Sequence, residues 1–274
     1  MPPSLPPPGR DRPATVIAPS ILAADFAALG EAAAAMTAAG ADELHVDAMD
    51  GHFVDNLTLG PPVVAALAAS TRLPLDVHMM LSDPGAWVER FAAAGAASMT
   101  FHIETCYADG GALYDAAVPT RAMTDDELAN ARRLCTKIRD LGCRVGVALR
   151  PATPADDAAA LVASGHVDMV LVMSVEPGFG GQSFMAGVMP KVTALRSAAA
   201  GGAGLAIQVD GGVSPSTVGA VAAAGANCIV AGSAVFGAPD PPRVIAQLRT
   251  AVDEAAAATA SAAMPTPPVP TAVA

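Results

Sequence analysis

Residues 205–215 have the sequence LAIQVDGGVSP, in which an apolar run ends at an aspartate that two glycines follow. An apolar run of this length, 205–209, is typical of a buried strand. Ser214 and Pro215 are typical of the start of a helix, because serine accepts hydrogen bonds from free backbone N–H groups and proline has no N–H to satisfy. The segment therefore predicts a strand, a glycine turn and a helix.

The same unit recurs eight times along the chain, and Thr124 and Glu127 mark another helix start because they have the spacing of a capping box. We expect strands near residues 16–20, 43–47, 75–79, 98–102, 144–148, 169–173, 205–209 and 228–231, and helices near 25–39, 61–70, 84–94, 125–141, 154–164, 185–200, 214–224 and 241–257. Alternating strands and helices form parallel sheets with right-handed crossovers, so eight units predict an α/β fold, a closed (β/α)8 barrel in one domain. A doubly wound open sheet is the alternative, but no GxGxxG motif follows the first expected strand.

The expected barrel domain covers residues 14–254. Residues 1–13 are rich in proline, and residues 255–274 are rich in alanine, threonine, serine and proline. Neither end has an apolar periodicity that could pack, so we expect two mobile tails. Residues 107–124 are long for a connection between a strand and a helix, which predicts an insertion there.

The composition argues against several classes of protein. Of the 274 residues, 53% are hydrophobic and 15% are charged, which provides enough apolar surface for a full core. The 15 Lys and Arg against 26 Asp and Glu give a net charge of −11, which argues against binding to nucleic acid or to anionic membranes. The uncharged stretch 211–239 is broken by glycine, serine and proline, so no transmembrane segment is expected.

The cellular location can be inferred from the first residues and the cysteines. Residues 1–13 lack the apolar segment of a signal peptide, and the four cysteines lack the spacing of a zinc finger. We therefore expect a cytoplasmic protein with reduced thiols. A plastid protein whose transit peptide has been removed is the alternative.

Four polar side chains stand at the ends of three expected strands. His45 and Asp47 lie two apart, so the strand period points both to one face, while His78 ends the third strand and Asp210 follows the seventh. Each alone is most simply a core histidine or a helix-capping aspartate. Together they bring two carboxylates close, which is unfavourable unless a cation lies between them. A His2Asp2 set suits one Zn²⁺, Fe²⁺, Mn²⁺ or Co²⁺ ion, and no organic cofactor is expected.

Three loops carry glycine at the same rim. Gly211–Gly212 follow the seventh strand and Gly232–Ser233 the eighth, where barrels of this kind commonly bind phosphate with backbone N–H groups. The loop 176–182 contains Gly178, Phe179, Gly180 and Gly181, which favours a hinged lid that excludes water; an ordinary flexible loop is the alternative.

Methionines and two further histidines lie near the same rim in the sequence. We expect Met49, Met79, Met80 and Met173 to line it as an apolar floor, although methionine there is more often core filler. His52 lies in a loop and His102 ends the fourth strand, so we expect supporting or structural roles for both.

Five motifs closely resemble the ribulose-phosphate 3-epimerase family, over about residues 17–249. The motifs are APSILAADF (18–26), HVDAMDGHFV (45–54), DVHMM (76–80), VMSVEPGFGGQSF (172–184) and VDGGV (209–213). The resemblance implies a TIM barrel that interconverts D-ribulose 5-phosphate and D-xylulose 5-phosphate in pentose phosphate metabolism and the reductive carbon-fixation (Calvin) cycle. The sequence departs from the family at Asp55, where proline is common, at Arg150, where a small polar residue or lysine is common, and in the long segment 107–124.

The resemblance also implies roles for individual residues. His45, Asp47, His78 and Asp210 would hold the metal, and Asp47 and Asp210 would transfer protons at C3 through a metal-stabilised enediolate. The substrate contacts would be Ser20, Met49, His78, Met80, Met173, Gly178, Phe179, Gly180, Gly181, Asp210, Gly211, Gly212, Gly232 and Ser233. The partner is a small phosphorylated ketose, and we expect a homo-oligomer.

Three other functions compete with this interpretation. An epimerase of a six-carbon ketose phosphate such as allulose 6-phosphate would use the same mechanism. A Schiff-base aldolase needs a lysine at the end of a strand, whereas the chain has only Lys137 and Lys191, both on or beside expected helices. A non-catalytic scaffold would be expected to lack one of the four metal-site residues, and all four are present.

Overall fold

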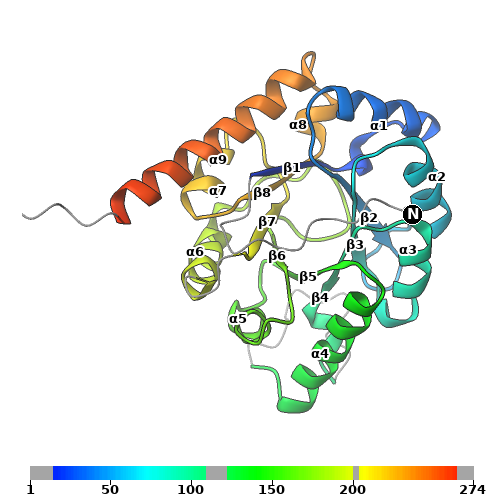
Figure 1. The fold of residues 1–274 in the computed structure, drawn as a ribbon, viewed down its shortest axis with the longest axis vertical. Coiled ribbons are helices and arrows are strands. Elements are labelled where there is room, and N and C mark those ends of the chain that lie inside the picture. Colours follow the sequence, from blue (N-terminus) through cyan, green and yellow to red (C-terminus); the bar gives the residue numbers. More distant parts are fainter. Residues whose placement is uncertain (1–14, 109–121, 200–203, 264–274) are drawn as a thin grey trace, which may run out of the picture.

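The computed structural model describes residues 15–108, 122–199 and 204–263. Eight strands form one parallel sheet in the order β1-β8-β7-β6-β5-β4-β3-β2. They are β1 (Val16–Pro19), β2 (Leu44–Met49), β3 (Leu75–Met80), β4 (Ser98–His102), β5 (Arg144–Leu149), β6 (Met169–Met173), β7 (Ala206–Asp210) and β8 (Cys228–Ala231). An isolated parallel bridge between Ser20 and His45 joins the two edge strands. The sheet thus closes into the expected single-domain (β/α)8 barrel (Figure 1).

Helices surround the barrel (Figure 1). The α-helices are α1 (Leu29–Ala38), α2 (Pro61–Ser70), α3 (Val88–Ala94), α4 (Asp125–Asp140), α5 (Asp156–Ala163), α6 (Met189–Ala198), α7 (Val218–Ala223), α8 (Ser233–Phe236) and α9 (Pro241–Ala263). Short 3-10 helices are η1 (Ile21–Ala23), η2 (Phe26–Ala28), η3 (Pro84–Ala86), η4 (Ile103–Cys106) and η5 (Ala186–Val188). The capping box of Thr124 and Glu127 is present at the start of α4.

Several boundaries differ from the expected ones. Ser214 does not cap α7, which starts only at Val218: the Ser214 hydroxyl pairs with that of Ser216 (2.8 Å) rather than with a backbone N–H. Strand β2 continues to Met49, two residues past the expected end at Asp47. Helix α9 continues to Ala263, so the expected C-terminal tail begins inside a helix, which its alanine-rich sequence favours. Residues 1–13 and 109–121 of the expected tail and insertion lie outside the described residues.

The strands alternate between an outer apolar face and a mixed inner face. Outward residues such as Val46, Val77 and Ile207 are buried in the main hydrophobic core, which the helices complete. Met79 belongs to this core, so its expected place at the rim is wrong; the period of two turns it away from the side of the sheet that His78 and Met80 share. The inner face is polar on some strands and apolar on others.

No helix within the described ranges combines the length and the apolar character that a bilayer crossing requires.

Candidate active site

A cavity of about 320 Å³ opens at the carboxyl ends of the strands. Its wall contains Asp47 and thirteen of the fourteen residues that the sequence assigned to substrate: Ser20, Met49, Met80, Met173, Gly178, Phe179, Gly180, Gly181, Asp210, Gly211, Gly212, Gly232 and Ser233. His45 and His78 do not line the cavity, because both are fully buried. Each lies within contact distance of Asp47, which does line it.

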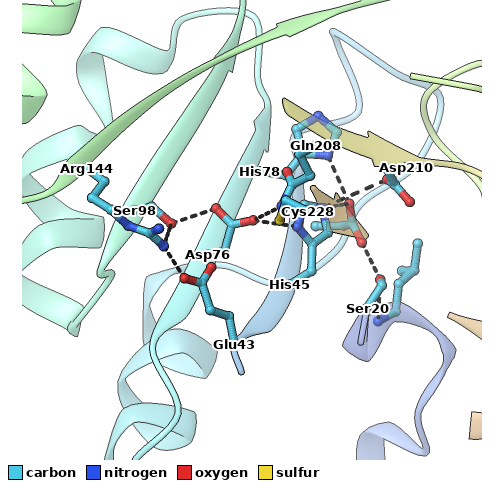
Figure 2. A network of polar contacts seen from close by, with 12 residues as sticks. Ser20, Glu43, His45, Asp76, His78, Ser98, Arg144, Gln208, Asp210 and Cys228 are labelled. Atoms are coloured by element: carbon cyan, nitrogen blue, oxygen red, sulfur yellow. Dashed lines mark hydrogen bonds and ion pairs between the residues drawn. The ribbon is translucent and has the colours of Figure 1, made fainter. Parts of the chain in front are cut away.

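His45, Asp47, His78 and Asp210 converge on one point, since each offers an atom within 4.8 Å of the others'. His78 Nδ1 lies 3.0 Å from Asp47 Oδ1. His45 Nε2 lies 3.4 Å from Asp47 Oδ1 and 3.9 Å from Asp210 Oδ2. The convergence, seen in part in Figure 2, brings together side chains of β2, β3 and β7.

The bonding of His45 tests whether this set fits a metal. Its Nδ1 is 2.8 Å from Asp76 Oδ2, whereas its Nε2 is buried and has no hydrogen-bond partner among the described residues. A buried polar atom without a partner is costly, and this one faces two carboxylates. Nitrogen and oxygen ligands lie about 2.0–2.2 Å from zinc and similar ions, so neighbouring ligand atoms are about 3 Å apart. The residues therefore fit a divalent ion.

The two carboxylates ionise differently. Burial, together with the nearby charge of Asp47, raises the pKa of Asp210 to about 7. Burial also opposes ionisation of Asp47, but the nearby charge of His45 holds the pKa of Asp47 well below its usual range. Ser20 donates a hydrogen bond of 2.6 Å to Asp47 Oδ2, which suits an ionised carboxylate. One acid and one base thus face the same cavity near neutral pH.

Asp76 was not assigned a role from the sequence. It is fully buried and accepts hydrogen bonds from Ser98 (2.7 Å) and Gln208 (2.8 Å) as well as the bond from His45 (Figure 2). Burial would raise its pKa, but these hydrogen bonds hold the pKa at about 2, so it stays ionised. Asp76 lies two residues before His78 on the same face of β3, which is the signal that could have found it.

The two further histidines have different places. His52 lies in the exposed loop after β2, where its Nδ1 is 2.9 Å from the Asp50 carbonyl oxygen, and it does not reach the cavity. His102 is fully buried, and its Nε2 is 2.9 Å from Nε2 of His78. Glu104, on the other side of His102, was also missed by the sequence analysis.

The apolar part of the wall is held from behind by Arg150. Met49 and Met80 pack with Phe53 and Val54 in one cluster, while Met173 belongs to another. The Arg150 guanidinium lies 4.3 Å from the centre of the Phe53 ring and donates a hydrogen bond of 3.0 Å to the Phe53 carbonyl. Arg150, which departs from the family pattern, therefore fixes the loop after β2. Nothing in the structure explains the departure at Asp55, whose side chain is exposed.

The glycine loops after β6 and β7 pack closely on each other. A Cβ at Gly211 would lie 2.6 Å from Val175 Cγ2, and one at Gly212 would lie 2.6 Å from the Phe184 backbone nitrogen, so neither position accepts a side chain. The Ser174 hydroxyl lies within hydrogen-bond distance of the Asp210 (2.9 Å) and Gly211 (2.7 Å) carbonyls, which joins the two loops. Phe179 is 57% exposed at the tip of the loop after β6.

Neither lysine is placed for Schiff-base chemistry. Lys191 donates hydrogen bonds to the carbonyls of Arg150 (2.7 Å) and Pro151 (3.1 Å), and Lys137 pairs with Glu89 at 3.2 Å on the outside of the barrel. Neither lines the cavity. The four cysteines are buried and free, as expected for reduced thiols.

Comparison with known proteins agrees with the sequence motifs. Residues 16–236 match the model of the ribulose-phosphate 3 epimerase family. The cytoplasmic isoform of ribulose-phosphate 3-epimerase from rice (Oryza sativa subsp. japonica) is 47% identical over 241 residues, which cover 88% of this chain and 95% of that protein. The Bacillus subtilis ribulose-phosphate 3-epimerase is 40% identical over 235 residues, covering 85% and 97%.

More distant solved structures share the fold alone. The KGPDC from Streptococcus mutans has a TM-score of 0.58 at 15% identity and covers 88% of this chain and 99% of its own. The 3-hexulose-6-phosphate synthase from Salmonella typhimurium has a TM-score of 0.57 at 16% identity, covering 88% and 99%. With the family match over most of the barrel and close curated relatives, the chain belongs to the ribulose-phosphate 3-epimerase family, whose members are isomerases that act on carbohydrates.

Proposed function

We propose that the protein interconverts D-ribulose 5-phosphate and D-xylulose 5-phosphate by inverting C3, with Asp47 and Asp210 as the acid/base pair. The observation that carries the proposal is that two carboxylates face one cavity, where their surroundings shift the two pKa values in opposite directions. The names of the curated relatives support the choice of substrate.

The chemistry follows from the two protonation states. Inversion of a carbon beside a ketone requires a base that removes the proton from one face and an acid that returns a proton to the other. The low pKa of Asp47 keeps it ionised and able to accept a proton, and the pKa of Asp210 near 7 lets it hold the proton that it returns. In the reverse direction the two side chains exchange roles.

We further propose that one divalent ion, Zn²⁺, Fe²⁺, Mn²⁺ or Co²⁺, is held by His45, Asp47, His78 and Asp210. When bound, such an ion supplies Lewis-acid stabilisation of the negative charge that develops on the ketose oxygens. Asp47 can both bind the ion and transfer a proton, because its two oxygens lie in different surroundings. Oδ1 faces the two histidines, while Oδ2 accepts a hydrogen bond from the Ser20 hydroxyl.

The remaining wall of the cavity suits the rest of a phosphorylated ketose. Met49, Met80 and Met173 provide an uncharged surface beside the reacting carbon. The loops of Gly211–Gly212 and Gly232–Ser233 provide backbone groups for the phosphate without a lysine. In a protein of net charge −11, a neutral metal site and an uncharged floor limit repulsion of the dianionic substrate.

The test is solvent exchange at the substrate C3 position in deuterated water. Asp47→Asn and Asp210→Asn should each abolish deuterium incorporation, while Asp55→Asn, the same change at an exposed position of the rim, should leave it intact. Retained exchange in either of the first two variants would eliminate the acid/base assignment. Circular dichroism of each variant checks that the barrel still forms.

An epimerase of allulose 6-phosphate remains the second candidate, because one extra carbon changes the length of the substrate and not the mechanism. Parallel assays of the two sugars with matched enzyme and metal decide between them. A higher kcat/KM for allulose 6-phosphate would overturn the pentose as substrate. A scaffold without activity predicts no exchange with either sugar.

Three expectations from the sequence stay predictions. They are the domain limits 14–254, a homo-oligomeric state and a cytoplasmic location, the last supported by the name of the rice relative. Light scattering of the purified protein measures the oligomeric state directly, and a single monomeric mass would contradict the second expectation.

A further inference from the structure

The hydrogen bond between two buried histidines, His78 and His102, needs one proton and one lone pair. Nε2 of His78 lies 2.9 Å from Nε2 of His102, and neither side chain is exposed. If both nitrogens carried a proton, or neither did, the contact would be repulsive. The partners of His102 therefore decide which histidine donates.

Glu104 provides the deciding constraint. Its Oε2 lies 3.0 Å from Nδ1 of His102, and its Oε1 accepts hydrogen bonds from the Arg150 backbone N–H (2.8 Å) and the Thr153 hydroxyl. An ionised carboxylate can only accept hydrogen bonds, so Nδ1 of His102 is the donor in its contact with Glu104. In a neutral His102, Nε2 is then the acceptor, and Nε2 of His78 carries the shared proton.

The same reasoning leaves a lone pair on Nδ1 of His78. That nitrogen lies 3.0 Å from Asp47 Oδ1, so two electron-rich atoms face each other across the distance that separates neighbouring ligands of one ion. A proton on this nitrogen would prevent coordination.

We propose that His102 and Glu104 are positioning residues that hold the proton of His78 on Nε2 and thereby turn its Nδ1 lone pair toward the metal. The proposal rests on the metal site proposed above. The carboxylate of Glu104 thus acts on His78 through His102, and we call this pair the relay. His45, in contrast, contacts the carboxylate of Asp76 directly.

Two substitutions of His102 separate this role from simple packing. The centres of the His102 and Phe53 rings lie 4.6 Å apart, so His102→Phe keeps an aromatic ring there but removes the acceptor. In His102→Gln the amide oxygen can accept from His78 and the amide nitrogen can donate to Glu104. The proposal predicts about 10- to 100-fold weaker Co²⁺ binding for His102→Phe, the usual effect of losing such a partner, and near-normal binding for His102→Gln. A packing role predicts the reverse order.

Thr100→Val is the matched control. Thr100 lies on the same strand two residues before His102, and its hydroxyl is buried without a hydrogen-bond partner among the described residues. Its Co²⁺ affinity, measured by titration of the cobalt absorption bands, should equal that of the wild type. Equal affinities of His102→Phe and Thr100→Val would overturn the proposal.

A measurement on the wild type does not depend on any variant folding. In zinc-loaded, ¹⁵N-histidine-labelled protein, long-range ¹H–¹⁵N spectra should show His78 protonated on Nε2 and His102 on Nδ1 only. A proton on Nδ1 of His78, or on both nitrogens of His102, would overturn the relay while leaving the metal site intact. Failure of the wild type to bind either Co²⁺ or Zn²⁺ would refute the proposed metal site and the relay with it.

Discussion

The inner face of the barrel has two unlike halves. On β2, β3, β4 and β7 it carries polar side chains such as His45, Asp76 and His102, all fully buried. On β5 and β6 it carries Ala148, Leu171 and Met173, which pack with Val175 in an apolar cluster. The outer face of both halves belongs to the same apolar core, so only the inner residues differ.

The difference shows which half does chemistry and which half stabilises the barrel. In the polar half every buried polar atom needs a hydrogen-bond partner, and some have none among the described residues, including His45 Nε2 and the Gln208 amide oxygen. Such atoms cost free energy of folding unless a ligand satisfies them. The apolar half has no such cost and gains from burial. Perturbing one half at a time should therefore separate metal binding from stability.

Removal of the metal should have the largest effect. If the polar half is a metal site, chelation followed by desalting should slow C3 exchange by on the order of 10³-fold, because Lewis-acid stabilisation is worth several kcal/mol. Re-addition of single ions should restore activity and identify those that fit. Full activity of protein shown to be metal-free by elemental analysis would contradict the site.

Truncation of a buried side chain in the apolar half should lower the stability of the protein and leave metal binding unchanged. Leu171→Ala should lower the free energy of unfolding by about 2–5 kcal/mol, the range for deletion of a large buried side chain. Urea unfolding in the presence of chelator measures this, and cobalt titration of the folded variant should give the wild-type affinity. A large loss of affinity would show that the two halves are coupled.

Loss of Asp76, which contacts His45 directly, should have the next largest effect. Asp76→Asn should weaken Co²⁺ binding about 10- to 100-fold, because the carboxylate that orients His45 Nδ1 is lost. Ser98→Ala, which removes only one of the donors to Asp76, should have a smaller effect on the same titration. A loss of Co²⁺ affinity in Ser98→Ala as large as that in Asp76→Asn would contradict the orienting role of the Asp76 carboxylate.

The smallest effect is a dependence on pH. Metal binding displaces the proton of Asp210, whose pKa burial raises to about 7. Below about pH 7 the proton competes, so affinity should fall at least about tenfold per pH unit, and loss of a proton from His45 would steepen the slope. Cobalt titrations between about pH 6 and about pH 8 measure this. A flat profile would contradict the raised pKa of Asp210.

The fold and the four-residue cluster could be predicted because both depend on local patterns. The alternation of strands and helices repeats in each unit, and the period of two places His45 and Asp47 on one face wherever β2 ends. The same period should have included Asp76 and excluded Met79, so those two errors came from applying it incompletely.

Other features could not be predicted because they depend on distant contacts. The role of Glu104 follows from its contacts with His102, Arg150 and Thr153. No spacing in the sequence predicts its contacts with Arg150 and Thr153. The late start of α7 depends on contacts of the Ser214 hydroxyl with those of Ser216 and Thr217, which compete with capping for the same side chain.

One close approach inside the barrel links two positions on neighbouring strands. A Cβ at Gly146 would lie 2.1 Å from the Thr100 hydroxyl oxygen, so alanine at 146 cannot coexist with threonine at 100. Serine or alanine at residue 100 would not make room, because the Thr100 Cβ itself would lie 2.9 Å from the new atom. A library that varies residue 146 should therefore return glycine, even when residue 100 is also allowed to become serine or alanine.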